Sequence, residues 1–134
     1  MNAAVIVLDS GVIGEATSNG AFREAIRELI DLGWTPVVPT VVLAECVTGR
    51  ASDAPTNQAI ARFNTTDTDK AMARRAGILR FRAQRASGQR MPSGIDAIVA
   101  AHAAAAATAV VFTTDPTDLR RLLVDFPNIR VEKP

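Results

Sequence analysis

The chain alternates between short, continuous apolar runs and longer segments in which apolar residues recur at helical spacing. The first run, residues 3–8, is rich in valine and isoleucine, as is typical of a strand buried on both faces. Further strands are predicted over residues 34–38, 109–112 and 129–131. Because helical segments separate these runs, we expect parallel strands joined by helical crossovers.

The segments between the strands carry helix signals. Apolar spacing and capping residues predict helices over residues 20–32, 40–47, 67–86 and 116–124, and an alanine-rich helix that begins at Ser93. Gly77 is a point where the long helix could be interrupted. Residues 51–57 read as a polar loop, followed by a helix to Phe63. The pattern therefore predicts the α/β class, with helices on both faces of a sheet.

Composition narrows the class of protein. A chain of 134 residues supports one domain, 1–134, because two would each be too small for an ordinary core. The net charge of +1 argues against the strongly basic class of nucleic-acid-binding proteins. The single cysteine, Cys46, excludes a fold held together by internal disulfides. No basic leader precedes the first apolar run, and half of the apolar stretch 97–114 is alanine. We expect a cytoplasmic protein with no membrane partner.

Four acidic residues stand where a carboxylate is unusual. Asp9 and Asp115 directly follow predicted strands, and Glu45 and Asp96 lie within strongly apolar helical segments. Ligand sites of open α/β sheets lie outside the carboxyl ends of the strands, so the two strand-end acids can face one crevice. Carboxylates in apolar surroundings are costly unless they are paired or bind a metal. A hard divalent cation such as Mg²⁺ or Mn²⁺ would resolve their mutual repulsion.

Each acid also has a purely structural explanation. Asp96 fits a capping box, and Asp115 fits the N-cap of a helix with proline at its first position. Asp9 would then be a turn residue and Glu45 a solvated helix residue. Four independent helix caps would not require an acid at each of these places, so the shared site is the stronger interpretation.

Four short segments, VLDSGVI, PTVVLAE, IDAIVAA and VFTTD, follow one another at residues 7–13, 39–45, 95–101 and 111–115. In these motifs and their order the chain resembles the PIN-domain ribonucleases, and among them the VapC-type toxins of bacterial toxin–antitoxin pairs. The resemblance covers nearly the whole chain and implies a PIN-like three-layer α/β/α sandwich with a central, mostly parallel sheet. Gly11 departs from the pattern, because the family often has a hydroxyl residue there.

The resemblance implies an endoribonuclease, dependent on Mg²⁺ or Mn²⁺, that hydrolyses phosphodiester bonds of single-stranded or loop RNA. Asp9 and Asp96 would be the principal metal ligands, with Asp115 completing the set directly or through water. Glu45 would position or activate the attacking water or hold a second metal, so these four acids are the predicted catalytic residues. Asp118 is expected to support the site or cap its helix. The implied partners are RNA and a VapB-type antitoxin protein, with a homodimer left open.

Charge distribution and apolar helices suggest where these partners bind. Residues 70–90 hold seven basic residues and no acid, which indicates either a solvated helix face or an edge that grips phosphates. In the second interpretation Arg82 and Arg85 contact RNA. The segments 22–30 and 41–47 could form an apolar groove for a partner helix. An arginine of that partner could pair with the four acids and displace the metal.

Other functions of small α/β proteins fit less well. A response-regulator receiver requires a lysine at the end of the last strand, and this chain has none there. A haloacid-dehalogenase phosphatase requires an aspartate at position 11, where this chain has glycine. A non-catalytic PIN-fold protein that binds RNA or protein is the serious alternative, and the presence of all four acids argues against it. The lone His102 is expected to be a core or surface residue rather than a ligand.

Overall fold

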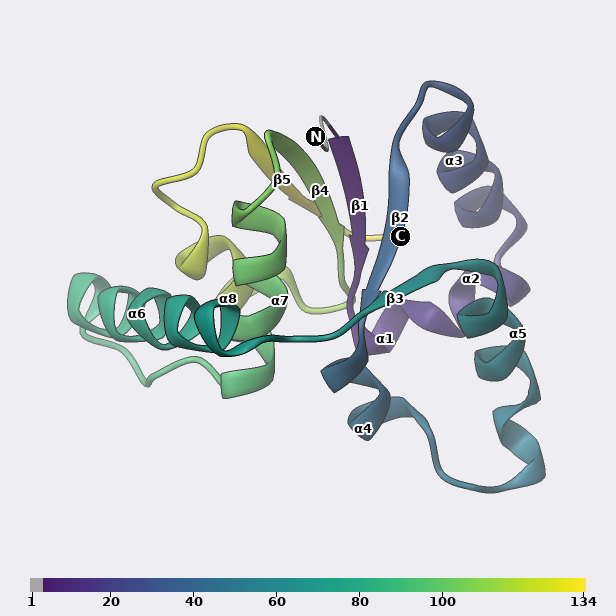
Figure 1. The fold of residues 1–134 in the computed structure, drawn as a ribbon, viewed down its shortest axis with the longest axis horizontal. Coiled ribbons are helices and arrows are strands. Elements are labelled where there is room, and N and C mark those ends of the chain that lie inside the picture. The colour runs from purple at the N-terminus through teal and green to yellow at the C-terminus, as the bar shows by residue number, and fades with distance from the viewer. Residues whose placement is uncertain (1–3) are drawn as a thin grey trace.

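The computed structural model describes residues 4–134, and its centre is a five-stranded sheet (Figure 1). All neighbouring strands pair in parallel, in the order β3-β2-β1-β4-β5. The strands are β1 (Ala4–Leu8), β2 (Thr35–Pro39), β3 (Asn64–Thr66), β4 (Thr108–Phe112) and β5 (Ile129–Glu132). The predicted α/β class is confirmed; Ala3, predicted to open the first strand, lies outside the described residues.

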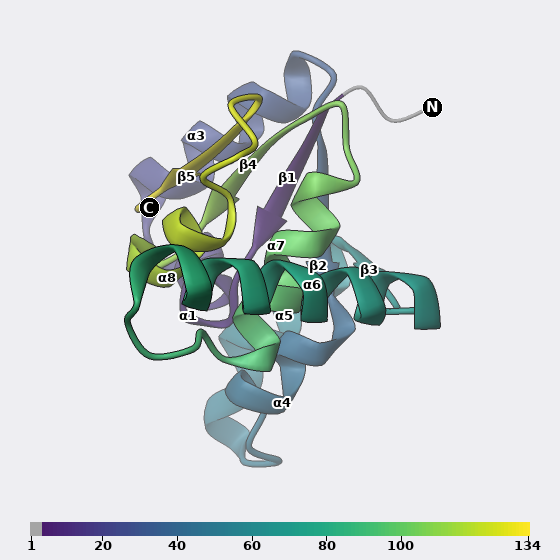
Figure 2. The ribbon, with the colours of Figure 1, turned by 90° about the vertical axis from the view of Figure 1, so that its left-hand side faces the viewer.

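Helices cover both faces of this sheet, which makes the three-layer sandwich that was expected. Helices α2, α3 and α5 lie on one side, and α6, α7 and α8 on the other (Figures 1 and 2). The helices are α1 (Ser10–Ile13), α2 (Glu15–Ser18), α3 (Gly20–Asp31), α4 (Leu43–Cys46), α5 (Ala54–Arg62), α6 (Lys70–Ser87), α7 (Gly94–Ala104) and α8 (Pro116–Leu122). Short 3-10 turns span Thr40–Val42 and Ala51–Asp53.

The core forms around β1 and β4, whose side chains are buried on both faces of the sheet. On one face Phe22 of α3 meets Phe112 of β4 edge to face, with ring centroids 4.9 Å apart. On the other face α7 presents buried alanines, among them Ala97 and Ala101, so that its backbone approaches the sheet closely. This double burial explains why both strands read as uninterrupted apolar runs.

Several local details differ from the predictions. The loop expected over residues 51–57 is largely helical, because Pro55 occupies the first turn of α5, where its missing N–H is no loss. The helix expected over residues 40–47 is a 3-10 turn followed by the single turn of α4. Helix α6 runs without a break past Gly77, and the side chain of Asp69 caps its start by accepting the Met72 N–H at 2.8 Å. The edge strand β3 was not expected.

The order of the strands creates a switch point between β1 and β4. From β1 the chain builds β2 and β3 outward on one side, then returns through α6 and α7 to build β4 and β5 on the other. Consecutive crossovers therefore diverge from β1, and the carboxyl ends of β1 and β4 border the crevice where ligands of such sheets bind. In the described part of the chain, no helix is long and apolar enough to cross a membrane.

Candidate active site

Asp9 lies at this switch point, and hydrogen bonds fix both its backbone N–H and its carboxylate. Its N–H donates to the Phe112 carbonyl at 3.1 Å, which continues the pairing of β1 with β4 beyond the strands. One carboxylate oxygen, Oδ1, accepts the N–H of Ser10 at 2.8 Å, so that Asp9 caps α1. The other, Oδ2, accepts the hydroxyl of Thr113 at 2.8 Å. The buried carboxylate therefore has a fixed orientation at the end of the two central strands.

Glu45 approaches Asp9 from a different element. It lies in the first turn of α4, and its exposed carboxylate accepts the hydroxyl of Ser10 at 3.1 Å through Oε1. Ser10 thus links the two acids, since its N–H binds Asp9 and its hydroxyl binds Glu45. The sequence analysis did not single out Ser10 or Thr113, although a hydroxyl residue directly after an acid or a strand is the signal that marks each of them.

Asp96 occupies the first turn of α7, beside these two acids. The side chain of Ser93 caps the helix by accepting the Asp96 N–H at 3.1 Å, as the capping pattern predicted. Burial, followed by the charges of Asp9, Asp118 and Glu45, raises the pKa of Asp96 to about 6. The charges of Asp9, Glu45 and Asp118 therefore all act on Asp96 at this edge of the sheet.

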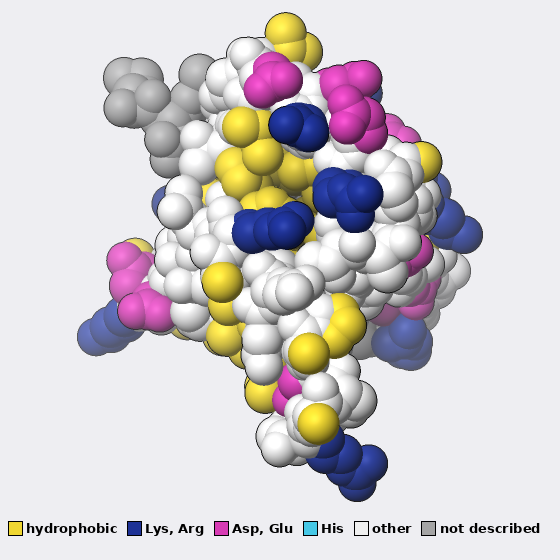
Figure 3. All heavy atoms as spheres, turned by 90° about the vertical axis from the view of Figure 1, so that its right-hand side faces the viewer, with side chains coloured by type: hydrophobic (Ala, Val, Ile, Leu, Met, Phe, Trp, Pro, Cys, Tyr) yellow, Lys and Arg dark blue, Asp and Glu magenta, His cyan; other side chains and the backbone are white. Residues whose placement is uncertain are grey.

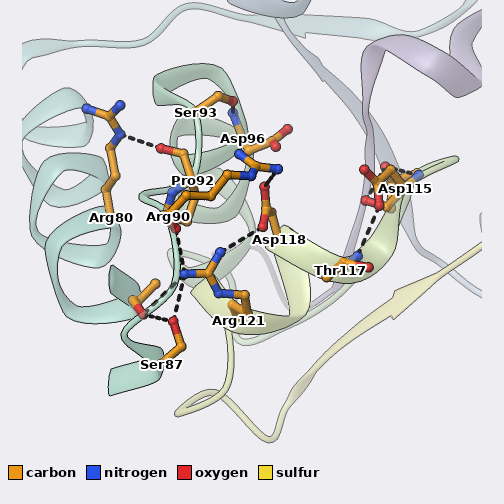
Figure 4. Close-up of polar contacts among 12 residues, drawn as sticks. Arg80, Ser87, Arg90, Pro92, Ser93, Asp96, Asp115, Thr117, Asp118 and Arg121 are labelled. Atoms are coloured by element: carbon orange, nitrogen blue, oxygen red, sulfur yellow. Dashed lines mark hydrogen bonds and ion pairs between the residues drawn. The ribbon is translucent and has the colours of Figure 1, made fainter. Parts of the chain in front are cut away.

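The two acids of α8 have different surroundings. Asp115 is exposed and caps α8 by accepting the Thr117 N–H at 3.4 Å. Asp118 is buried and pairs with Arg121 at 2.9 Å and with Arg90 at 3.1 Å (Figure 4). Of the two, Asp118 is the one whose charge acts on Asp96. The expectation that Asp118 supports the site is consistent with this position, and the metal-ligand role of Asp115 stays a prediction.

Gly11 has a local reason to lack a side chain. A Cβ at this position would collide with the hydroxyl oxygen of Thr114, which follows β4. The close approach of α1 to the end of β4 therefore favours glycine. The hydrogen bonds of Ser10 and Thr113 hold the neighbouring acids although position 11 carries no hydroxyl.

The donor chemistry of this group of acids suits a hard cation. Its ligand atoms are carboxylate oxygens, the donors that Mg²⁺ and Mn²⁺ prefer. Burial and the nearby negative charges that raise the pKa of Asp96 are both features that a bound cation would offset. Among residues 4–134, no three His, Cys, Asp or Glu side chains lie close enough together to hold a metal ion in common. Because Mg²⁺ keeps several waters and uses one or two carboxylates, such a set still fits.

His102 takes no part in the group, as the sequence analysis expected. It is buried on α7, and its Nε2 lies 3.0 Å from the hydroxyl of Thr68. Burial lowers the pKa of His102, so the neutral ring is favoured. It is a core residue with a satisfied polar contact.

The protein is therefore a parallel α/β/α sandwich with an acidic candidate site at the carboxyl edge of its sheet. More specifically, the chain belongs to the PIN domain family, whose model matches residues 6–122. Among curated proteins, none matches this chain.

Two solved structures have the same fold. The first is VapBC2 from Rickettsia felis bound to a DNA fragment from its promoter, with a TM-score of 0.67 and 21% identity over 97% of this chain and 98% of that chain. The second is FitAB bound to the IR36 DNA fragment, with a TM-score of 0.65 and 16% identity over 96% of this chain and 94% of that chain.

The raised pKa of Asp96 makes a prediction about stability. The ionised carboxylate is disfavoured in the folded state, so its contribution to stability falls as pH rises from about 4 to about 6 and stays low above that. In EDTA at pH 7.5, Asp96→Asn should therefore raise the free energy of unfolding by about 1 kcal/mol. The gain should shrink toward pH 4.5, as measured by urea denaturation at each pH.

The matched control is Asp67→Asn, at an exposed position for which the described residues offer no ion pair. Its stability should stay within about 0.5 kcal/mol of the parent at every pH. A destabilised Asp96→Asn at pH 7.5 would show that Asp96 is held by favourable contacts rather than crowded by charge.

Proposed function

We propose that the chain is a metal-dependent endoribonuclease that hydrolyses RNA phosphodiester bonds and acts as the toxin of a VapBC-type toxin–antitoxin pair. The observation that carries this proposal is the arrangement of acids at the switch point of the sheet, where Ser10 donates hydrogen bonds to both Asp9 and Glu45 and their charges act on Asp96. Membership of the PIN domain family supports a nuclease. The fold neighbours VapBC2 and FitAB support the toxin–antitoxin setting.

The proposed roles follow from the surroundings of each acid. Asp9 and Asp96 would hold Mg²⁺ or Mn²⁺, and Asp115 would complete the set directly or through water. The bound ion supplies a more acidic water and offsets charge that grows on the phosphate. Thr113 and the N–H of Ser10 fix the carboxylate of Asp9 before any ligand arrives.

Glu45 is the candidate for handling the attacking water. The hydroxyl of Ser10 donates to its Oε1, and among the described residues no hydrogen bond reaches its Oε2. The carboxylate is exposed, so that its Oε2 is available to orient the water and accept a proton from it.

The enzymatic part of the proposal is tested by cleavage. Purified protein should cut single-stranded RNA with Mg²⁺ or Mn²⁺ and not in excess EDTA. Asp9→Asn and Asp96→Asn should each lower the cleavage rate by at least about a hundredfold, because each removes a charge that holds the ion. The control Asp67→Asn should cleave like the parent. Full cleavage in EDTA would contradict the metal; no cleavage under any condition would favour the non-catalytic PIN-fold alternative.

The proposed antitoxin has a groove of about 400 Å³ available on the α3 side of the molecule. Figure 3 shows this face, with apolar side chains in a hollow and basic side chains at its rim. The groove is lined by Ala16, Arg23, Ile26, Arg27, Ile30, Arg62 and Phe63. Helix α3 contributes as the sequence analysis expected, but the opposite wall comes from the end of α5 rather than from residues 41–47.

The chemistry of this groove indicates the kind of segment that fits it. The apolar floor suits the apolar face of a helix, and the arginines suit acidic residues that flank that face. We propose that the VapB-type antitoxin binds here and places an arginine of its own among the acids of the site. That arginine would compete with the metal for the carboxylates. A homodimer of the chain stays a prediction.

A single exposed residue of α3 tests the partner. Ile30→Asp puts a charge on the groove floor and should weaken antitoxin binding by more than about tenfold, since a buried isoleucine contributes roughly 1.5–3 kcal/mol. Cells that express Ile30→Asp with the product of the adjacent short open reading frame should stop growing, whereas wild type with that product should grow.

The control is Leu32→Asp, two residues away, 77% exposed and outside the groove. It should be neutralised like wild type. Neutralisation of Ile30→Asp would place the partner elsewhere, and harmless expression of the wild type alone would contradict the toxin assignment itself.

A further inference from the structure

One buried carboxylate at the edge of the acidic site is paired with two arginines. Oδ1 of Asp118 accepts a hydrogen bond from Nη1 of Arg121 at 2.9 Å, and Oδ2 accepts one from Nη2 of Arg90 at 3.1 Å. The two arginines differ in exposure: the side chain of Arg121 is 14% exposed and that of Arg90 is 74% exposed. Figure 4 shows Arg90 reaching toward Asp118 from the loop that precedes α7, on the side where Asp96 lies. The inner arginine is structural, and the outer one faces solvent.

Arg121 is immobilised by several contacts at once. Besides Asp118, its Nη2 donates to the hydroxyl of Ser87 at 2.8 Å and to the backbone carbonyl of Arg90 at 2.8 Å. A longer bond of 3.5 Å reaches the carbonyl of Ala83 in α6. Arg121 therefore neutralises Asp118 and anchors the loop between α6 and α7 to α8.

The same loop is fixed at both ends, so the position of Arg90 is defined. Gly88 ends α6 in the left-handed conformation, with φ of 65°, and turns the chain back. Near the other end, Nε of Arg80 donates to the carbonyl of Pro92. The backbone of Arg90 is thus held beside the acidic site, while its guanidinium has one ion pair and is otherwise exposed.

The Arg90 side of this ion pair is open to solvent, which screens its charge and weakens its contribution to stability. If Arg90 leaves Asp118, the buried carboxylate keeps Arg121 and is not left unpaired. The exchange of Arg90 from Asp118 to another anion is therefore inexpensive. An anion that approaches Asp9, Glu45 and Asp96 is repelled by their negative charges, so a positive side chain beside them would favour its binding.

We propose, on the basis of the proposed ribonuclease function, that Arg90 contacts a backbone phosphate of the RNA substrate at the acidic site. Its guanidinium would exchange the carboxylate of Asp118 for phosphate oxygens, which it can bind through two parallel N–H groups. This assignment moves the phosphate contact away from Arg82 and Arg85. Those two residues line a groove of about 900 Å³ on α6, together with Asp125, and none of the four predicted catalytic acids lines it.

Binding of a fluorescently labelled single-stranded RNA in EDTA, followed by anisotropy over a series of salt concentrations, tests the contact. Arg90→Gln should weaken binding by about tenfold and reduce the slope of log affinity against log salt by about 0.7, the loss of one single-strand phosphate contact. Arg90→Lys keeps the charge and should retain the slope, with part of the affinity lost. Thermal unfolding should show that both variants are folded, since Arg121 still holds Asp118.

The control for net charge is Arg130→Gln, at an exposed position on the edge strand β5, which should match the wild type in affinity and slope. Equal behaviour of Arg90→Gln and Arg130→Gln would overturn the inference, as would a loss confined to Arg82→Gln and Arg85→Gln. The same RNA is also incubated with wild type and Mg²⁺. If the wild type cleaves this RNA but Arg90→Gln binds it as tightly as the wild type does, only the inference about Arg90 fails. If the wild type neither binds nor cleaves the RNA, the proposed function is contradicted as well.

Discussion

The parallel pairing of β1 with β4 is the contact on which the candidate site depends. Its register sets Leu8 beside Phe112, so the residues that follow, Asp9 and Thr113, meet through a buried hydrogen bond although they are 104 positions apart in the chain. The connection from β3 to β4 through α6 and α7 places Asp96, at the start of α7, at the same edge. A site of this kind exists only in the folded protein.

The acids at this edge are stabilised in unequal ways. Asp118 is neutralised by Arg121, and Asp9 is held by two hydrogen bonds. Asp96 has no ion pair among the described residues, and its burial, together with the charges of Asp9, Asp118 and Glu45, raises its pKa to about 6. Unpaired charge in such surroundings is unfavourable, and proteins retain it mainly where it serves a site. The arrangement fits a cation that is bound for function rather than for folding.

Much of the fold was predictable, because buried strands and amphipathic helices leave local signals. Helix α3 ends one residue before its predicted bound, and α7 begins one residue after its predicted start. The edge strand β3 was missed because its three residues are all exposed, and the start of α5 because its first turn is polar. The site was predictable in part. The positions of acids after strands and within apolar segments pointed to Asp9, Glu45, Asp96 and Asp115 as one group. Asp118 was expected only to support the site or cap its helix, and its burial beside Arg121 left no local signal. Which of Asp115 and Asp118 turns inward depends on Arg121 and on the packing of α8 against α6.

We propose that Asp96 lies in a group of carboxylates that binds a divalent cation, and this central proposal has a direct test. Carbon-13 NMR of the side-chain carboxyl of Asp96, followed against pH in EDTA and again in Mg²⁺, measures this directly. The account predicts a pKa of about 6 without metal and a clear downward shift of that pKa when Mg²⁺ is added. A pKa near the ordinary value of about 4, unchanged by Mg²⁺, would contradict it.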